Sequence, residues 1–290
     1  MIVSTSISLL ILSSYSFIDV TGVDAERLLQ GQLTINVSTP DEETAYLAAL
    51  CNAKGRVISL FFISKIEHGF RLFMPQSIIK TTIEHLNKYG VFFKAVIQEA
   101  PAESKLIAYI DNQKESNSNQ PTLNNRINLA NTQLSLAICT NESNMASLAN
   151  THSLELINND SEWYQYLTKH KIPWINNDSV EHFLPHDLNL PKLDAIDFKK
   201  GCYTGQEIIA RMHYKGKLKQ HLQRLNGEFD SKILPKTSLL QDDRKVGEVI
   251  CSIGSNPKRV SVLALVKDKA NINDFFQLDD KNSPILKIEK

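Results

Sequence analysis

The stretch FKKGCYTGQEIIAR, residues 198–211, contains the side chain best suited to chemistry in this sequence, the thiol of Cys202. Thr204 and Glu207 stand three residues apart just before an apolar run. This is the spacing of a capping box, so we expect a helix to begin at about Gly205. Cys202 then lies just outside the helix N-terminus, where free amides and the helix dipole favour negative charge. A thiol in such surroundings is a nucleophile or a metal ligand.

The residues beside Cys202 strengthen this prediction. Lys199 and Lys200 favour the thiolate form, and Gly201 and Gly205 leave room for a ligand to approach the backbone. The alternative is an inert, buried cysteine beside a capped helix. The sequence supports these two interpretations about equally.

Basic residues continue beyond the cysteine. Residues 199–224 contain a single acid, Glu207, and the following cations: Lys199, Lys200, Arg211, Lys215, Lys217, Lys219 and Arg224. Because the formal net charge of the whole chain is zero, this run is a local cationic surface that suits nucleic-acid phosphates or another anion. A solvated face without a ligand is the simpler interpretation of the run on its own.

The whole chain has the composition of a folded, soluble protein. It has 290 residues, of which 42% are hydrophobic and 22% charged, so we expect two or three modules. Its four cysteines are Cys51, Cys139, Cys202 and Cys251, and no two of them form a Cys-x-x-Cys pair. That pattern disfavours a zinc site or a redox pair and fits reduced thiols in a cytosol.

The apolar beginning, MIVSTSISLLILSSYSF, has two interpretations. It lacks a basic n-region and a clear cleavage site, so a signal peptide is disfavoured. Its apolar run is also too short to span a bilayer. We therefore expect a buried first strand.

The elements that must position Cys202 follow an α+β pattern. Residues 23–34 predict a short helix stopped by Gly31, residues 44–75 three strands, and residues 77–90 an amphipathic helix followed by another strand. The polar stretch 111–125 predicts a loop or local insertion.

The second half of the chain begins with a predicted helix at residues 161–171, which ends before Pro173. Short alternating strands after about residue 222 predict a small C-terminal β-barrel. The expected division is an α+β core over residues 1–222, made of two intertwined domains, and a barrel over residues 223–290.

The cysteine stretch closely resembles the signature of the YgfZ family, Lys-Gly-Cys-(Phe/Tyr)-x-Gly-Gln-Glu-x-x-x-Arg with a further lysine beyond it. The matching residues are Lys200, Gly201, Cys202, Tyr203, Gly205, Gln206, Glu207 and Arg211, with Lys215 or Lys217 as the later lysine. The segments VTGVDAERLLQGQLTINV, LAALCNAKGRV and FLPHDLNL also resemble the family. The similarity covers residues 15–224, with a weaker match in the barrel.

This resemblance implies a fold like the folate-binding T-protein (aminomethyltransferase) of glycine cleavage, with three domains in a ring around a folate channel. It implies a tetrahydrofolate-type ligand and a role in maintaining iron–sulfur enzymes, including a radical enzyme that thiomethylates tRNA. The T-protein's acidic pair falls here on Ser59 and Leu60, neither of which can act as a carboxylate. Aminomethyl transfer is therefore expected to be lost.

The resemblance also places two aromatic residues in the folate channel, Tyr15 and Trp163, where a flat pterin stacks well. A core aromatic on an amphipathic helix is the alternative for Trp163. The expected protein is thus cytoplasmic, binds folate but no metal or membrane, and supports iron–sulfur enzymes through Cys202. Two alternatives stay open, a folate-dependent one-carbon transferase that uses Cys202 and a direct tRNA-binding accessory protein.

Overall fold

The computed structural model describes residues 7–111, 126–139, 156–229, 233–256, 258–278 and 285–289. The chain forms two compact units, which we describe one at a time. The first contains residues 1–31, 35–48 and 61–163, and the second residues 32–34, 49–60 and 164–290. Apart from Asp111, the predicted polar loop 111–125 lies outside the described residues.

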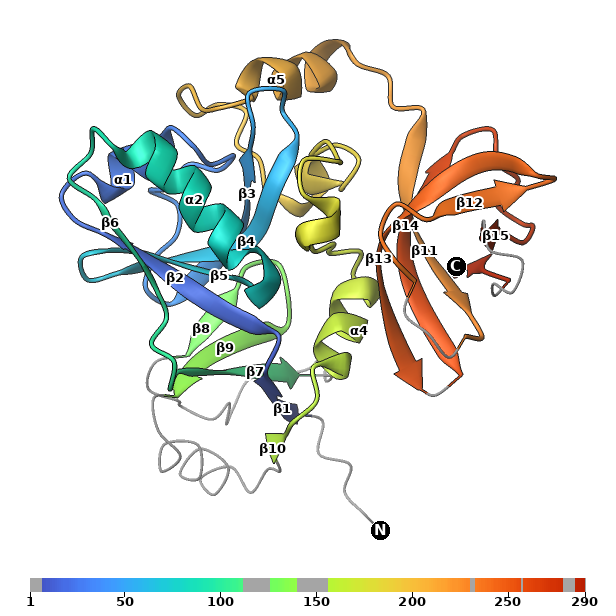
Figure 1. The fold of residues 1–290 in the computed structure, drawn as a ribbon, viewed down its shortest axis with the longest axis horizontal. Coiled ribbons are helices and arrows are strands. Elements are labelled where there is room, and N and C mark those ends of the chain that lie inside the picture. The colour runs from blue at the N-terminus through green and yellow to red at the C-terminus, as the bar shows by residue number, and fades with distance from the viewer. Residues whose placement is uncertain are drawn as a thin grey trace. The chain divides into compact units, whose positions relative to one another are not determined.

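A large sheet organises the first half of the chain (Figure 1). Its strands are β1 (Ile7–Leu12), β2 (Tyr15–Thr21), β3 (Thr44–Cys51), β4 (Val57–Ile66), β5 (Gly69–Pro75), β6 (Val96–Glu99), β7 (Lys105–Asp111), β8 (Ile127–Leu129), β9 (Leu134–Cys139) and β10 (Leu156–Ile157). Their order across the sheet is β10-β1-β7-β9-β8-β3-β4-β5-β2-β6. Leu9 and Leu10 are fully buried in β1, so the predicted first strand is confirmed. The three predicted strands of residues 44–75 are β3, β4 and β5.

Within the described residues, three helices accompany this sheet. They are α1 (Ala25–Gln30), α2 (Ile79–Gly90), which follows the 3₁₀ turn η1 (Gln76–Ile78), and α4 (Ser161–Lys169). Helix α2 packs on β2 and β6 through the predicted apolar face, in which Ile79 and Leu86 are buried. All three helices lie where the sequence predicts them.

The segment between α4 and the C-terminal sheet contains little regular structure. It holds the 3₁₀ turns η2 (Asn177–Ser179) and η3 (Leu190–Leu193) and the helix α5 (Gln206–Lys215). Backbone hydrogen bonds fix its path: the amide of Val57 donates to the carbonyl of Phe183, and the amide of Glu181 donates to that of Val57. The segment that carries the cysteine motif is thereby tied to the start of β4.

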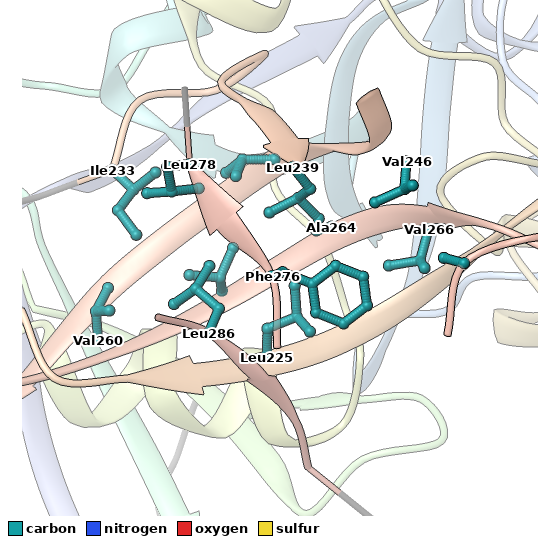
Figure 2. Packing of buried hydrophobic residues seen from close by; sticks show 13 residues of the cluster. Leu225, Ile233, Leu239, Val246, Val260, Ala264, Val266, Phe276, Leu278 and Leu286 are labelled. Carbon is teal, nitrogen blue, oxygen red and sulfur yellow. The ribbon is translucent and has the colours of Figure 1, made fainter. Parts of the chain in front are cut away.

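The C-terminal sheet is curled around its own core. Its strands are β11 (Gln220–Gly227), β12 (Ser238–Gln241), β13 (Arg244–Asn256), β14 (Arg259–Lys267), β15 (Gln277–Leu278) and β16 (Lys287–Ile288), in the order β15-β12-β13-β14-β11-β16. Leu225, Phe276 and Leu286 point into the apolar interior that Figure 2 shows. Reciprocal backbone hydrogen bonds between Phe276 and Leu286 join the segments of the two edge strands, so the sheet closes there.

The secondary structure confirms the α+β class and a small, curled all-β C-terminal sheet. Residues 242 and 243 form the turn that connects β12 to β13. Asp242 and Asp243 both have positive φ there, as a two-residue hairpin turn requires. Strand β11 begins at Gln220, close to the predicted boundary between residues 222 and 223. That boundary itself stays a prediction.

Candidate functional site around Cys202

Cys202 is exposed, whereas Cys51, Cys139 and Cys251 are buried. It lies in the loop that leads into α5, and the position of this loop is fixed by Gly205. Gly205 has a φ of 85°, and a Cβ on it would lie 2.6 Å from the carbonyl oxygen of Asn52 and 3.0 Å from the Cα of Gly55. The loop therefore rests directly on the turn between β3 and β4, which only glycine permits here.

That turn is built by the amide side chain of Asn52. Its Oδ1 accepts hydrogen bonds of 2.9 Å from the backbone amides of Lys54 and Arg56. The amide of Gly55, which has a φ of 70°, donates to the Asn52 carbonyl. The segments CNAKGRV and KGCYTGQE, separated by about 150 residues in the sequence, are thus packed against each other.

The predicted capping box is wrong. Helix α5 begins at Gln206, and its N-cap is Gly205 in the left-handed conformation, with no side-chain hydrogen bond to the helix amides. The Thr204 hydroxyl donates instead to Oε1 of Gln32, 3.3 Å away. Glycine is a tolerated N-cap, and the contact with the Asn52 turn requires it at this position. Sequence spacing placed the helix start correctly to one residue but assigned the wrong cap.

Lys200 contributes to the support of the loop. Its side chain is buried, and Nζ donates a 2.7 Å hydrogen bond to the Leu33 carbonyl and lies 5.0 Å from the centroid of the Tyr203 ring. Burial lowers the pKa of Lys200 to about 8, and nearby Asp197 acts in the opposite direction. Lys200, which was predicted to favour the Cys202 thiolate, therefore connects the cysteine loop to residues 32–34.

This lowered pKa predicts a pH-dependent stability. In the unfolded chain this lysine has a pKa near 10.5. The cost of burying its charged ammonium is therefore absent above pH 10.5. As the pH falls through about 8 the folded protein bears this cost in full and is less stable. Compared with Lys200→Met, which cannot titrate, the wild-type free energy of unfolding should rise by about 2 kcal/mol between pH 7 and pH 10. Urea unfolding at both pH values measures it, with Lys199→Met as the matched charge control. A difference independent of pH would contradict the buried ammonium.

The remaining motif residues divide into buried and exposed groups. Tyr203 is buried, and burial raises the pKa of its phenol, as do the neighbouring Cys51 thiol and Asp197. The amide of Gln206 donates to the Tyr203 carbonyl, which turns the chain into α5. Glu207 and Arg211 are exposed on the helix, and a Cβ on Gly201 would meet no atom within 4 Å. The surface around Cys202 is therefore open to solvent.

Ser59 and Leu60, which occupy the positions of the T-protein's acidic pair, are both buried in β4. The Ser59 hydroxyl has no hydrogen-bond partner within the part of the chain that the structure describes. A buried hydroxyl without a partner is costly, so it is a potential ligand contact. It cannot serve as a carboxylate base.

Tyr15 and Trp163 lie together in the first unit. Their ring centroids are 5.5 Å apart, with the planes at 74°, which is an edge-to-face contact. Asp160 brings them together, because its carboxylate accepts hydrogen bonds from the backbone amides of Ser13 and Ser14 and so joins the start of α4 to the β1–β2 turn. Trp163 is fully buried, and its indole N–H has no acceptor among the described residues.

The basic run of residues 199–224 is only partly a surface. Five of its seven cations are exposed, namely Lys199, Arg211, Lys215, Lys217 and Lys219. Lys200 is buried, and Arg224 is paired with Glu289 at 3.0 Å. The cationic surface is therefore smaller than the sequence count indicates.

One cluster beside the cysteine loop was not predicted. His213 of α5 stacks on Phe198 with ring centroids 3.7 Å apart, and the centroid of buried His186 lies 6.3 Å from that of His213. Burial lowers the pKa of His186, His213 lowers it further, and Asp187 opposes both. The only signal in the sequence was the position of His186 within FLPHDLNL, a family-like segment to which no role was assigned.

Comparison with known proteins supports the family resemblance, although no family model matches the chain. The chain is 28% identical over 242 residues to the tRNA-modifying protein YgfZ of Vibrio atlanticus, covering 81% of this chain and 74% of that protein. It is 27% identical over 279 residues to that of Colwellia psychrerythraea, covering 90% and 86%. It is 26% identical over 302 residues to that of Buchnera aphidicola, covering 95% and 92%.

Over most of its length the chain is similar to proteins of the YgfZ family. Among solved structures it resembles the glycine cleavage system aminomethyltransferase T of Bartonella henselae, with a TM-score of 0.68 and 14% identity over 99% of this chain and 86% of that one. This likeness confirms the predicted T-protein-like fold.

In the described part of the chain, no helix is long and apolar enough to cross a membrane. The same residues contain no group of three or more His, Cys, Asp or Glu side chains placed to hold a metal ion.

Proposed function

We propose that this protein binds a reduced folate and maintains iron–sulfur enzymes, including one that thiomethylates tRNA, with Cys202 as its functional thiol. The observation that carries the proposal is an exposed cysteine on a loop fixed by the Gly205–Asn52 contact, in a chain whose other cysteines are buried. The proposal is further supported by the name of its relatives, tRNA-modifying protein YgfZ, and by its T-protein-like fold. The protein acts in the cytoplasm.

One buried polar atom of the first unit fits a folate ligand. The indole N–H of Trp163, beside the Tyr15 ring, can donate to a pterin oxygen or nitrogen. A folate would bring a one-carbon carrier and a flat, stackable ring to these two aromatic residues. Because Trp163 is fully buried, a pterin reaches it only if neighbouring side chains move.

Tetrahydrofolate should bind the purified protein and quench the emission of Trp163. The chain has two tryptophans, so the titration uses Trp174→Phe, in which Trp163 is the sole indole emitter. Because a pterin in contact with Trp163 alters its surroundings, emission should fall saturably and calorimetry should give a matching midpoint. In Trp163→Phe the residual Trp174 signal should stay constant. Unchanged emission together with no heat of binding would argue against a folate site.

Cys202 should be the first cysteine to be alkylated. Burial raises the pKa of Cys51 and of Cys139, which keeps both thiols protonated and enclosed, and Cys251 is also buried. Brief iodoacetamide treatment near neutral pH, followed by peptide mass spectrometry, should label Cys202 at least about tenfold faster than the others. The protein unfolded in urea is the control, since all four rates should then converge. Equal rates in the folded protein would exclude a selectively accessible thiol.

The main alternative is a folate-dependent one-carbon transferase that uses Cys202. Its chemistry requires turnover of a folate adduct by the purified protein. The buried Ser59 and Leu60 do not favour transfer by the T-protein's carboxylate route.

Direct tRNA binding is a second alternative, and the five exposed cations between Lys199 and Lys219 favour it. Binding through those cations would weaken steeply with added salt.

A further inference from the structure

A cavity of about 810 Å³ lies on the outside of the C-terminal sheet. Its lining residues all belong to the second unit and include no residue of the cysteine loop. Its floor comes from three adjacent strands, β14, β11 and β16, and Gln165 of α4 also lines it. This volume lies in the range of small-molecule sites.

The register of the strands places a polar row on this floor. Asn226 of β11 lies directly opposite Ser261 of β14 and Lys287 of β16, so the three side chains share one face. The preceding residue, Leu225, points the other way into the apolar interior (Figure 2). The outer face of the sheet is therefore polar here, while the side chains of the inner face pack in the apolar core.

Hydrogen bonds order this row. The Ser261 hydroxyl donates to Oδ1 of Asn226 at 2.7 Å, and the Asn226 amide donates to the Glu289 carboxylate. Glu289 also pairs with Arg224 at 3.0 Å. The Nε–H of Arg224 remains buried without an acceptor among the described residues. Because this N–H is closed to solvent, a ligand in the cavity reaches it only if neighbouring side chains move.

The rim combines cations with exposed apolar groups. Phe275 and Ile285 are 46% and 54% exposed, although the residues that follow them, Phe276 and Leu286, are fully buried. The Lys287 ammonium lies 4.2 Å from the centroid of the Phe275 ring. Arg259 is exposed beside them, and the carboxylate of Glu228 also lines the cavity. An aromatic ring held beside cations is the arrangement that binds a base and its phosphate.

We propose that this cavity binds a nucleotide, with the base on Phe275 and the phosphate on Arg259 and Lys287. The nucleotide comes either free or as a unit of single-stranded RNA, and the two sources share this chemistry. The site depends on neither Cys202 nor folate, so it can be tested apart from the proposed function.

The test measures binding of a fluorescein-labelled single-stranded hexaribonucleotide by polarisation, with adenosine monophosphate as competitor. Phe275→Ala and Arg259→Ala should each weaken binding about tenfold, because each removes one stacking or phosphate contact. Lys80→Ala, which removes an exposed lysine of α2, is the matched charge control and should leave affinity unchanged. Thermal unfolding should show all three variants folded, since the substituted side chains are exposed.

Competition identifies the source of the nucleotide. Displacement of the RNA by adenosine monophosphate at similar concentration supports a free nucleotide, and its failure to displace supports single-stranded RNA. Three results would overturn the site: no saturable binding of either probe, equal affinity of the wild type and both barrel variants, or equal weakening by Lys80→Ala. Displacement by hexaglutamate as effective as by RNA would also overturn it, because the cavity would then recognise charge alone.

Discussion

Cys202→Ala should abolish function in cells while leaving the protein folded. In a strain deleted for the gene, plasmid-borne wild type should restore thiomethylated tRNA and the activity of iron–sulfur enzymes. The alanine variant should give the level of empty vector. The reason is that the exposed thiol carries the proposed activity, whereas its side chain contributes nothing to the core. Mass spectrometry of tRNA nucleosides and enzyme assays in extracts measure the effect.

The controls separate the thiol from the loop. Lys192→Ala removes an exposed side chain of η3 and should complement fully. Cys202→Ser keeps the size of the residue but replaces the sulfur, and it should fail as Cys202→Ala does. All variants should unfold at the wild-type temperature and keep the folate-dependent quenching of Trp163. If Cys202→Ala restores the tRNA modification in full, the thiol is structural and the function rests on folate binding alone.

The sequence predicted the elements well because their signals are local. The apolar face of α2 and the alternation in the C-terminal strands are short-range patterns, and burial follows them directly. The motif likewise pointed to Cys202, and the structure places that residue on the surface. The sequence could not choose between an exposed and a buried cysteine, because exposure depends on residues distant in the chain.

The errors arose where tertiary contacts override local spacing. Thr204 and Glu207 have capping-box spacing, but the contact of Gly205 with Asn52 makes glycine the N-cap. Lys200 and Arg224 were counted as surface cations. In the structure Lys200 donates a hydrogen bond to the Leu33 carbonyl, and Arg224 pairs with Glu289. No local pattern reveals such partners, because Leu33 lies 167 residues from Lys200 in the sequence and Glu289 lies 65 residues from Arg224.

Gly205→Ala should be the most destabilising small change in the motif. The Cβ would lie 2.6 Å from the Asn52 carbonyl oxygen, and alanine disfavours the φ of 85°. Positive φ alone costs an alanine about 1–2 kcal/mol, and the backbone contact adds to it, so we expect a loss of about 3 kcal/mol. Thermal unfolding should therefore shift downward by several degrees. Rescue of the deletion strain should fall as the cysteine loop moves away from the Asn52 turn.

Gly201→Ala provides the matched control within the same loop. It is also a glycine beside Cys202, but its φ is not positive and its Cβ would meet nothing within 4 Å. Its stability should therefore stay within about 0.5 kcal/mol of the wild type, as for an ordinary surface substitution. If both variants unfold alike, the packing of Gly205 on Asn52 does not hold the loop. If Gly205→Ala alone is destabilised and loses function, the two family-like segments act together, because the turn between β3 and β4 fixes the loop that presents the thiol.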